Sequence, residues 1–276
     1  MPQHNQETNL AIYAKPEIAE IYAGMTFLAA SEQALFEKYL RPQLSILDLG
    51  VGGGRTTPSL SHLASYYVGV DYSEAMVQAC RRKFPDLRFE VRDAADLSSF
   101  ADSSFDAVVF SYNGLDYLAP DCKRHDCLRE CYRVLRDEGI LIFSSHNPRS
   151  LFLGLGWDQQ RLNTLANKLM GGVPPLSYVA RAALTCVRAG WGLLRSGARA
   201  IPRASRRLPK RTFWRGEGYL IDPSHGGLLT HCGVPARVVE ELASFRFKLL
   251  QILPEDYPRK GGLYSTRWYY YAFSKN

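Results

Sequence analysis

Five short apolar runs alternate with helix-like segments in this chain, and this alternation constrains the fold more than any other feature. The runs lie at residues 45–49, 66–70, 87–91, 105–110 and 139–143. The segments between them carry apolar residues three and four positions apart, at 56–64, 73–84 and 123–136. Nearly continuous apolar character is typical of a strand that is buried on both faces. We therefore predict a parallel sheet with helices on both sides.

The pattern changes towards the C-terminal end. Residues 234–245 have the spacing of a helix, whereas 248–253 and 265–274 are apolar or aromatic segments typical of strands. No helix-like segment separates these two strands, so we expect them to pair antiparallel. The prediction is an α/β fold with a doubly wound, seven-stranded, mostly parallel sheet whose last strand is antiparallel, and with a helical insertion after the fifth strand.

The 276 residues divide into four parts around one core. Residues 15–40 carry apolar residues at helical spacing, which predicts a helical cap over 1–40. Residues 41–147 hold the five alternating strands and form the predicted core. The regular pattern then stops, so we interpret 148–217 as a basic insertion that forms a substrate lid, and 218–276 as the completion of the core sheet. A chain of this length can bury one sizeable core.

Composition limits where the protein works. No apolar run reaches the roughly 18 residues that a membrane-spanning helix needs, and the first residues lack the basic-then-apolar order of a signal peptide. The six cysteines form no C-x-x-C pair, which favours reduced thiols over a disulfide framework or a metal site. We expect a cytoplasmic protein without a bound metal.

A glycine-rich turn follows the first apolar run, in the sequence LDLGVGGGR at 47–55. A dinucleotide-binding turn has a third glycine at the position of Arg55. In addition, Asp48 stands two residues before the first glycine, where a carboxylate would repel a pyrophosphate. A carboxylate instead suits a ligand that carries an ammonium group and a cationic sulfur.

With this turn the chain resembles the class I S-adenosylmethionine-dependent methyltransferase family. The resemblance rests first on the turn itself, through Asp48, Gly50, Gly52 and Gly54, which it implies to be cofactor-binding. It rests next on the second strand, which ends in Val-Gly-Val-Asp71 about twenty residues later. The resemblance implies S-adenosylmethionine as the cofactor, with the Asp71 carboxylate accepting hydrogen bonds from both ribose hydroxyls.

Two further segments extend the resemblance. Residues 71–76 match the family's D-x-S-x-x-M pattern, which implies that Tyr72 and Met76 lie against the adenine. The third strand is followed by an Arg-Asp-Ala step. By resemblance, Asp93 accepts the adenine amino proton and the backbone of Ala94 meets the ring.

The segment after the fourth strand is similar to the one that borders the transferred methyl group in this family. It runs over 110–118 and would contribute Ser111 and Asn113 to cofactor binding. It lacks the Asn/Asp-Pro-Pro-Tyr motif of many amide- and base-nitrogen methyltransferases, which argues against those acceptors. The resemblance covers roughly 40–147 and, more loosely, 234–275, and it says nothing about the insertion.

An oxygen or amine acceptor loses a proton during methyl transfer, and histidine is the natural base near neutral pH. His146 follows the fifth strand, at the sheet edge where open α/β folds bind ligands. The other interpretation of His146 is a loop histidine that bonds to the backbone. His225 and His231, ahead of the next helix, are the other candidate bases. Tyr13 and Tyr22 either cover the cofactor or belong to the core.

Positive charge is concentrated in the insertion, where residues 148–215 carry 13 Lys and Arg against one Asp. Arg181, Arg188 and Arg195 recur every seven residues along one face of a predicted helix at 176–194. The 176–215 segment therefore suits an anionic membrane surface or an anionic acceptor. A solvated lid helix followed by a basic linker fits the same pattern.

These observations favour an S-adenosylmethionine-dependent O-methyltransferase that acts on a small hydroxylated metabolite, such as a sugar or a natural product. An acceptor that is lipid-linked or held at a membrane surface is the alternative, and it would place the protein peripherally at that membrane. An RNA acceptor is disfavoured because no RNA-binding module is recognisable, so nucleic acid is an unlikely partner. A non-catalytic binding protein is the remaining interpretation.

Overall fold

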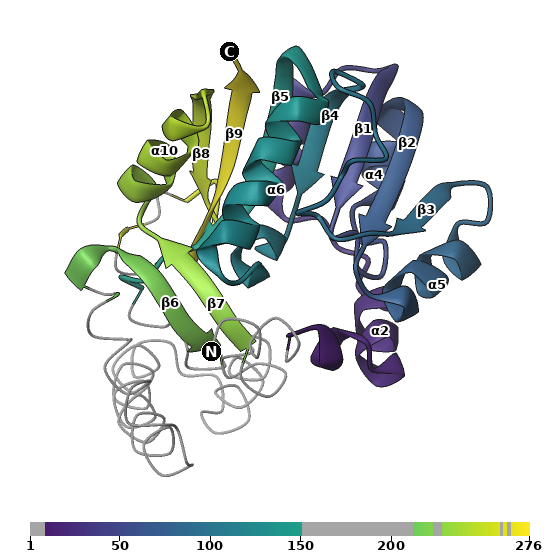
Figure 1. The fold of residues 1–276 in the computed structure, drawn as a ribbon, viewed down its shortest axis with the longest axis horizontal. Coiled ribbons are helices and arrows are strands. Elements are labelled where there is room, and N and C mark those ends of the chain that lie inside the picture. The colour runs from purple at the N-terminus through teal and green to yellow at the C-terminus, as the bar shows by residue number, and fades with distance from the viewer. Residues whose placement is uncertain (1–8, 151–211, 213, 223–227, 260–261, 264–265) are drawn as a thin grey trace, which may run out of the picture.

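The computed structural model describes residues 9–150, 212, 214–222, 228–259, 262–263 and 266–276. Its centre is a seven-stranded sheet with the order β3-β2-β1-β4-β5-β9-β8 (Figure 1). The strands are β1 (Leu44–Leu49), β2 (Ala64–Asp71), β3 (Arg88–Val91), β4 (Phe105–Phe110), β5 (Leu135–His146), β8 (Phe247–Pro254) and β9 (Trp268–Lys275).

The predicted strand directions are confirmed. β1 to β5 run parallel, and the last strand, β9, is antiparallel to both of its neighbours, β5 and β8. β9 lies one position in from the edge, with β8 outside it. Burial explains this order, because six of the eight residues of β9 are buried, whereas most residues of β8 keep some solvent exposure. The half-exposed strand thus forms the edge of the sheet.

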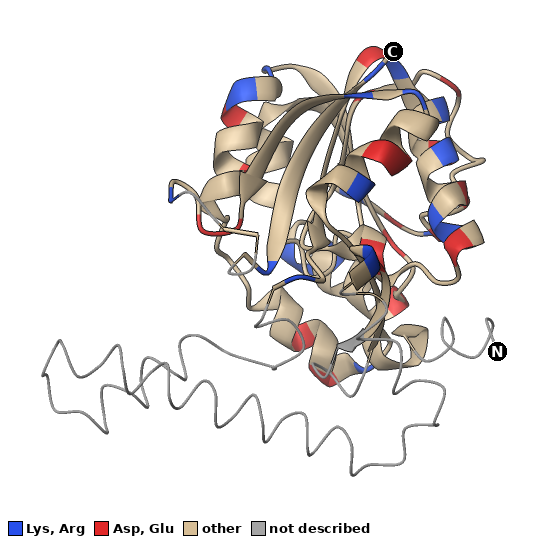
Figure 2. Cartoon of the chain, turned by 90° about the vertical axis from the view of Figure 1, so that its left-hand side faces the viewer, with Lys and Arg blue, Asp and Glu red and all other residues tan. Residues whose placement is uncertain are grey.

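Helices cover both faces of the sheet, as a doubly wound fold requires. On one face, α6 (Asp121–Val134) and α10 (Pro235–Ser244) pack through Leu128 and Leu242. On the other face lie α3 (Ala30–Tyr39), α4 (Thr57–Leu63) and α5 (Glu74–Lys83). Charged side chains are concentrated on the helices and connecting loops (Figure 2). Within the described residues, no helix has the length and apolar character needed to cross a membrane.

The N-terminal region is more broken than its helical spacing suggests. A helical turn at 9–13 is followed by α2 (Pro16–Ala23), and six residues then separate α2 from α3. The break has local causes, because α2 ends at Gly24 and the backbone of Ala29 is extended. α3 then begins with the Glu32 carboxylate accepting the backbone N–H of Ala29 at 2.9 Å. The break lets α2 pack against α5, close to the glycine turn (Figure 1).

A hairpin precedes α10 and does not join the main sheet. β6 (Glu217–Asp222) and β7 (Leu228–Gly233) pair antiparallel as a separate two-stranded sheet. The sequence pattern did not anticipate this hairpin, because we assigned 218–276 to the core sheet as a whole. The hairpin lies at the carboxyl end of the parallel strands, as does the N-terminal region (Figure 1). The predicted arginine-striped helix at 176–194 lies outside the described residues.

Candidate active site

A cavity opens at the carboxyl ends of the parallel strands, where open α/β sheets bind their ligands. Its walls come from the loops that follow β1 to β4 and from the N-terminal region. Eight of the eleven residues predicted to bind the cofactor line it, namely Gly50, Gly52, Asp71, Tyr72, Met76, Asp93, Ala94 and Ser111. Three predicted residues, Asp48, Gly54 and Asn113, are not on its wall.

The glycine turn adopts a backbone that side chains disfavour. Gly50 has a φ of 57° and Gly52 a φ of 55°, in the left-handed region that glycine enters without penalty. A Cβ atom on Gly50 would also lie 2.5 Å from Cε2 of Phe110. The turn thus requires glycine at this position, and its backbone forms part of the cavity wall.

Asp71 is a buried carboxylate whose only described partners are backbone amides. Its Oδ2 accepts the N–H of Gly52 at 2.9 Å, and its Oδ1 accepts the N–H of Ser73 at 2.9 Å. Among the described residues, no Lys, Arg or His lies within ion-pair distance of it. Burial raises the pKa of Asp71 to about 6, and the backbone hydrogen bonds offset only part of this rise. The carboxylate retains lone pairs that can accept hydrogen bonds from a ligand.

Asp48 does not reach the cavity, although the sequence suggested that it would meet the cofactor's ammonium group. It is almost fully buried, and its Oδ2 accepts hydrogen bonds from Thr56 Oγ1 at 2.8 Å and from the Tyr67 hydroxyl at 2.9 Å. Burial raises its pKa to about 6. Asp48 therefore connects β1 to the start of α4 and to β2. Gly54 faces α5, where a Cβ atom would lie 2.7 Å from the ring of Phe84.

At the predicted adenine end of the cavity, Met76 and Ala94 are buried wall residues. Asp93 is partly exposed. Its Oδ1 accepts the N–H of Ala95 at 2.9 Å, and its Oδ2 pairs with Lys123 Nζ at 2.9 Å. The lysine thus occupies one of the two oxygens that we assigned to the adenine amino group.

Four tyrosines cluster on the cavity wall. The Tyr13 ring centre lies 5.9 Å from that of Tyr22, 6.1 Å from that of Tyr72 and 5.9 Å from that of Tyr117, in edge-to-face contacts. The sequence singled out Tyr13 and Tyr22 as possible covers of the cofactor, and both lie on the cavity wall. Such rings exclude water and attract cations.

Two cavity residues had no signal in the sequence pattern. Asn9 donates from Nδ2 to the carbonyls of Tyr117 and Leu229, at 3.1 and 3.2 Å, and so ties the N-terminal region to the hairpin. Arg55 is buried and forms a bidentate ion pair with Glu32 of α3, at 2.7 and 2.6 Å. In the sequence, Arg55 was notable only because it stands where a dinucleotide-binding turn has its third glycine.

Ser111 belongs to the same ion-pair cluster. Its hydroxyl contacts the Glu32 carboxylate and lies 3.2 Å from Nη2 of Arg55. The Arg55 guanidinium also lies over the rings of Phe27 and Tyr112, 5.4 and 5.0 Å from their centres. These contacts fix the wall of the cavity that follows β4.

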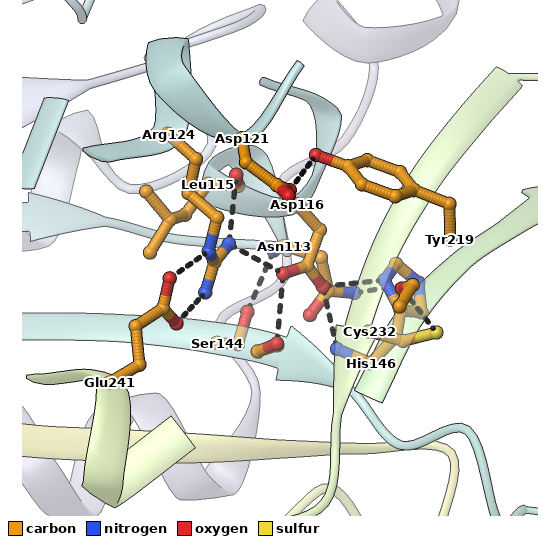
Figure 3. Close-up of polar contacts among 12 residues, drawn as sticks. Asn113, Leu115, Asp116, Asp121, Arg124, Ser144, His146, Tyr219, Cys232 and Glu241 are labelled. Carbon is orange, nitrogen blue, oxygen red and sulfur yellow. Dashed lines mark hydrogen bonds and ion pairs between the residues drawn. The ribbon is translucent and has the colours of Figure 1, made fainter. Parts of the chain in front are cut away.

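His146 and Asn113 lie behind the cavity wall, in a buried polar network (Figure 3). The centre of this network is Asp116, in the short 3-10 helix η1 (Gly114–Tyr117) that follows β4. The carboxylate of Asp116 accepts the backbone N–H of His146 at 2.6 Å and the hydroxyl of Ser145 at 2.8 Å. Nδ1 of His146 lies 2.9 Å from the same carboxylate.

A buried arginine connects Asp116 to α10. Nη1 of Arg124 lies 3.2 Å from Oδ1 of Asp116, and its Nε and Nη2 donate to Glu241 at 2.8 and 2.9 Å. Burial alone would raise the pKa of Asp116, but its contacts with His146 and Arg124 prevail and lower that pKa below the ordinary value. The pKa of Glu241 is also lowered, because Arg124 outweighs the effect of burial.

Asn113 lies at the other end of this network. Its backbone N–H donates to Ser144 Oγ at 2.7 Å, and its Nδ2 lies 3.3 Å from His146 Nε2. Its Oδ1 is buried and has no hydrogen-bond partner among the described residues. Both Asn113 and Tyr112 have positive φ, at 63° and 54°, a conformation that is uncommon outside glycine and occurs often at functional sites.

The remaining candidate bases lie elsewhere. His231, on β7, lines a second cavity together with Asp121, Arg215 and Glu217. Burial lowers the pKa of His231 to about 4, so its imidazole is neutral at physiological pH. Its ring packs edge-on against Tyr219, with centres 5.4 Å apart. His225 lies outside the described residues.

Comparison with known proteins gives a partial match. A family model described as a methyltransferase domain matches residues 47–143. A demethylmenaquinone methyltransferase of Beutenbergia cavernae is 39% identical over 102 residues, which make up 37% of this chain and 40% of that protein. A carboxy-S-adenosyl-L-methionine synthase of Aliivibrio fischeri is 32% identical over 153 residues, 51% of this chain and 62% of that protein. The matched regions therefore span less than two thirds of these relatives.

The fold comparison covers more of the chain. The crystal structure of a Burkholderia thailandensis 1,6-didemethyltoxoflavin-N1-methyltransferase superimposes with a TM-score of 0.58 over 100% of this chain and 91% of that one, at 13% identity. That structure holds S-adenosylhomocysteine and 1,6-didemethyltoxoflavin, and the likeness to it shows a shared fold. The part of the chain that matches a methyltransferase domain, residues 47–143, contains most of the strands and loops that form the cavity. This part is therefore similar to methyltransferase domains, and the chain as a whole shares the fold of the compared structure.

Proposed function

We propose that this chain transfers the methyl group of S-adenosylmethionine to a small-molecule acceptor. The observation that carries the proposal is Asp71, a buried carboxylate that faces a cavity beside the glycine turn and has no cationic partner in the part of the chain that the structure describes. Two ribose hydroxyls would supply the donors that this carboxylate lacks. Each hydrogen bond to a charged group contributes about 1.5–3 kcal/mol.

The cavity suits the chemistry of methyl transfer. The methyl carbon leaves the cationic sulfur and bonds to the acceptor atom in an in-line displacement, so the enzyme chiefly aligns the two atoms and excludes water. Residues 110–118 border the cavity next to the ion-pair cluster of Glu32, Arg55 and Ser111, which holds that wall in place. The tyrosine cluster, which reaches this wall through Tyr117, adds rings that exclude water and would attract the sulfonium.

We infer that the acceptor is a hydroxylated metabolite, a sugar or a natural product, and that oxygen is methylated. His146 supports this inference, since a hydroxyl loses a proton as its oxygen takes the methyl group and an imidazole can receive that proton. In the structure the Asn113 amide stands at Nε2 of His146, at a long distance of 3.3 Å. The acceptor hydroxyl would take its place there and donate to the same nitrogen.

The experiment is a labelling assay. The protein is incubated with methyl-labelled S-adenosylmethionine and a host cell extract, and the products are separated into water-soluble metabolites, lipids and RNA. We expect label in the metabolite fraction, and no label with Asp71→Ala. Label confined to lipid would favour the membrane-surface acceptor suggested by the 176–215 segment. An absence of transfer, with cofactor bound, would overturn the proposal.

A further inference from the structure

We propose that Asp116 is a positioning residue, held by Arg124 and Glu241, that keeps His146 in the tautomer with Nδ1 protonated and Nε2 free to accept a proton. The inference rests on the proposed function, because it explains how the base of that reaction is held in the form that can accept a proton. The inference concerns the buried network of Figure 3, in which His146 is connected through Asp116 and Arg124 to Glu241.

The first step is the charge of Asp116. Its carboxylate has no solvent exposure and meets donors from Arg124, from the Ser145 hydroxyl and from the backbone of His146. An ionised carboxylate only accepts hydrogen bonds, and this environment favours the ionised form. The contact of 2.9 Å between Oδ2 and His146 Nδ1 therefore requires the proton to be on Nδ1.

The second step is the state of Nε2. With Nδ1 protonated, Nε2 of a neutral imidazole carries a lone pair. Asn113 fits this assignment, because it directs its amide nitrogen to Nε2 at 3.3 Å, while its own oxygen has no hydrogen-bond partner among the residues that the structure describes. This is the weakest contact of the network, so the amide can be displaced by an acceptor hydroxyl without breaking the contacts of Asp116.

The third step is the sum of the charges. Glu241 and Asp116 are anions and Arg124 is a cation, so the three groups together carry one negative charge. When His146 takes up a proton, the four groups become neutral as a set. A proton that His146 takes from the acceptor would therefore come to lie beside a net negative charge.

Other groups surround His146 and enter its electrostatic balance. Tyr117 of η1 and Trp268 of β9 touch its ring, with ring centres 6.1 and 6.2 Å away. His231 of β7 and Tyr271 of β9 interact electrostatically with Asp116. The lowered pKa of His231 keeps it neutral near pH 7. His125 of α6 also faces the set, with its Nε2 3.8 Å from Oε1 of Glu241, beside the charged groups Asp116, Arg124 and Glu241.

Nitrogen NMR of the imidazole tests the tautomer without an acceptor. The full chain is labelled with 15N, and His146→Gln identifies the His146 signals. At pH 7.5 we expect the shift of a protonated nitrogen at Nδ1 and that of a bare nitrogen at Nε2, with S-adenosylhomocysteine present or absent. Asp116→Asn should move most of the population to the Nε2-protonated form. A proton on Nε2 in the wild-type protein would overturn the proposal.

A second variant covers the case in which Asp116→Asn fails to fold. Glu241→Gln, on α10, keeps a hydrogen-bonding partner for Arg124 and removes one anion from the set. We expect the share of the Nδ1-protonated tautomer at pH 7.5 to fall, because Arg124, and through it Asp116, is then held less firmly. Glu240→Gln is the matched control, because Glu240 is exposed and pairs with Arg237, and it should leave the tautomer unchanged. Equal tautomer populations in the three proteins would contradict the proposal.

The two proposals fail in different ways. If methyl transfer is absent but His146 shows the predicted tautomer, the network is real and the proposed reaction is wrong. If transfer occurs and His146 carries its proton on Nε2, the function stands and Asp116 does not prepare the base. Once an acceptor is known, Glu241→Gln should lower kcat at pH 7.5 and leave the affinity for S-adenosylhomocysteine unchanged, whereas Glu240→Gln should change neither.

Discussion

Asp71 and Asp116 are both fully buried carboxylates at the carboxyl edge of the same sheet, yet their pKa values shift in opposite directions. That of Asp71 rises to about 6, because burial is opposed only by backbone amides. That of Asp116 falls, because contacts with His146 and Arg124 outweigh burial. The first faces an open cavity and the second is enclosed by protein.

The difference distinguishes two uses of a buried charge. A carboxylate whose partners are all supplied by the chain belongs to the framework, and removing a partner destabilises the fold. A carboxylate that has only backbone amides as partners is costly in the free protein, and it gains further hydrogen bonds from a ligand. On this account Asp71 belongs to the cofactor site and Asp116 to the support of the base. The following substitutions test that division.

The largest effect is expected at Arg124. Arg124→Met removes the cation from between the fully buried Asp116 and the partly buried Glu241. We expect the free energy of unfolding to fall by about 3–5 kcal/mol, measured by urea denaturation. Arg129→Met, at an exposed position of the same helix, is the control and should change stability by about 0.5 kcal/mol or less. If the two variants lost similar amounts of unfolding free energy, the buried ion pairs of Arg124 would not be part of the framework.

The next largest effect is expected on cofactor binding. Asp71→Ala removes the acceptor of two charged hydrogen bonds, so the affinity for S-adenosylhomocysteine should fall about 100-fold in calorimetry. The protein should stay folded without ligand, because relief from the buried charge offsets the loss of the hydrogen bonds from the Gly52 and Ser73 amides. Unchanged affinity would show that Asp71 does not hold the cofactor.

The pH dependence of binding follows from the raised pKa of Asp71. Ribose hydroxyls bind the charged carboxylate best, so affinity should decrease as the pH falls through about 6. Between pH 7.5 and 5.5 we expect a loss of about threefold to fivefold in calorimetry. Asp71→Asn cannot titrate, and its weaker binding should vary less over this range. A wild-type affinity that is constant with pH would contradict the assignment.

Folding stability should depend on pH with opposite signs at the two carboxylates. Because the folded pKa of Asp71 lies above its unfolded value, its effect on stability is most favourable at low pH and is lost as the pH rises through about 6. The depressed pKa of Asp116 stabilises the fold above the unfolded value, and this contribution is lost on acidification. Asp71→Asn should abolish the first slope in urea denaturation, whereas Ser73→Ala, which keeps the backbone amide, should not.

The smallest effect is expected at the exposed end of the cavity. Lys123 pairs with Asp93 at 2.9 Å, and both side chains are about one third exposed. Such pairs contribute at most about 1 kcal/mol. Lys123→Met should free an oxygen of Asp93 and raise cofactor affinity about twofold in the same calorimetry. A loss of affinity would mean that the lysine itself contacts the cofactor.

Local sequence patterns were sufficient for the strands and for most of the cavity. The apolar runs correspond to β1–β5, and the glycine turn, Asp71, Tyr72 and Met76 meet at one edge because parallel strands end together there. The place of β9 inside β8 depends on the relative burial of two strands, which the pattern did not resolve. The β6–β7 hairpin lacks the two-residue turn that marks a hairpin in sequence.

The network around His146 was beyond the sequence, because its members come from segments that are distant along the chain. Nothing local distinguishes Asp116 from a carboxylate of a surface loop, or Arg124 and Glu241 from surface residues of an amphipathic helix. Asp48 differs in the opposite direction. Its place in the motif suggested a contact with a ligand, whereas in the structure its carboxylate accepts hydrogen bonds from Thr56 and Tyr67. Contacts between segments that are far apart in the sequence thus decide which carboxylate lines the cavity.

The most direct test of the central claim is a crystal structure of the protein with S-adenosylhomocysteine. The account predicts both ribose hydroxyls within hydrogen-bond distance of the Asp71 carboxylate, and the thioether sulfur beside residues 110–118. A nucleoside bound elsewhere, or an Asp71 carboxylate that keeps only its backbone partners in the complex, would contradict the account.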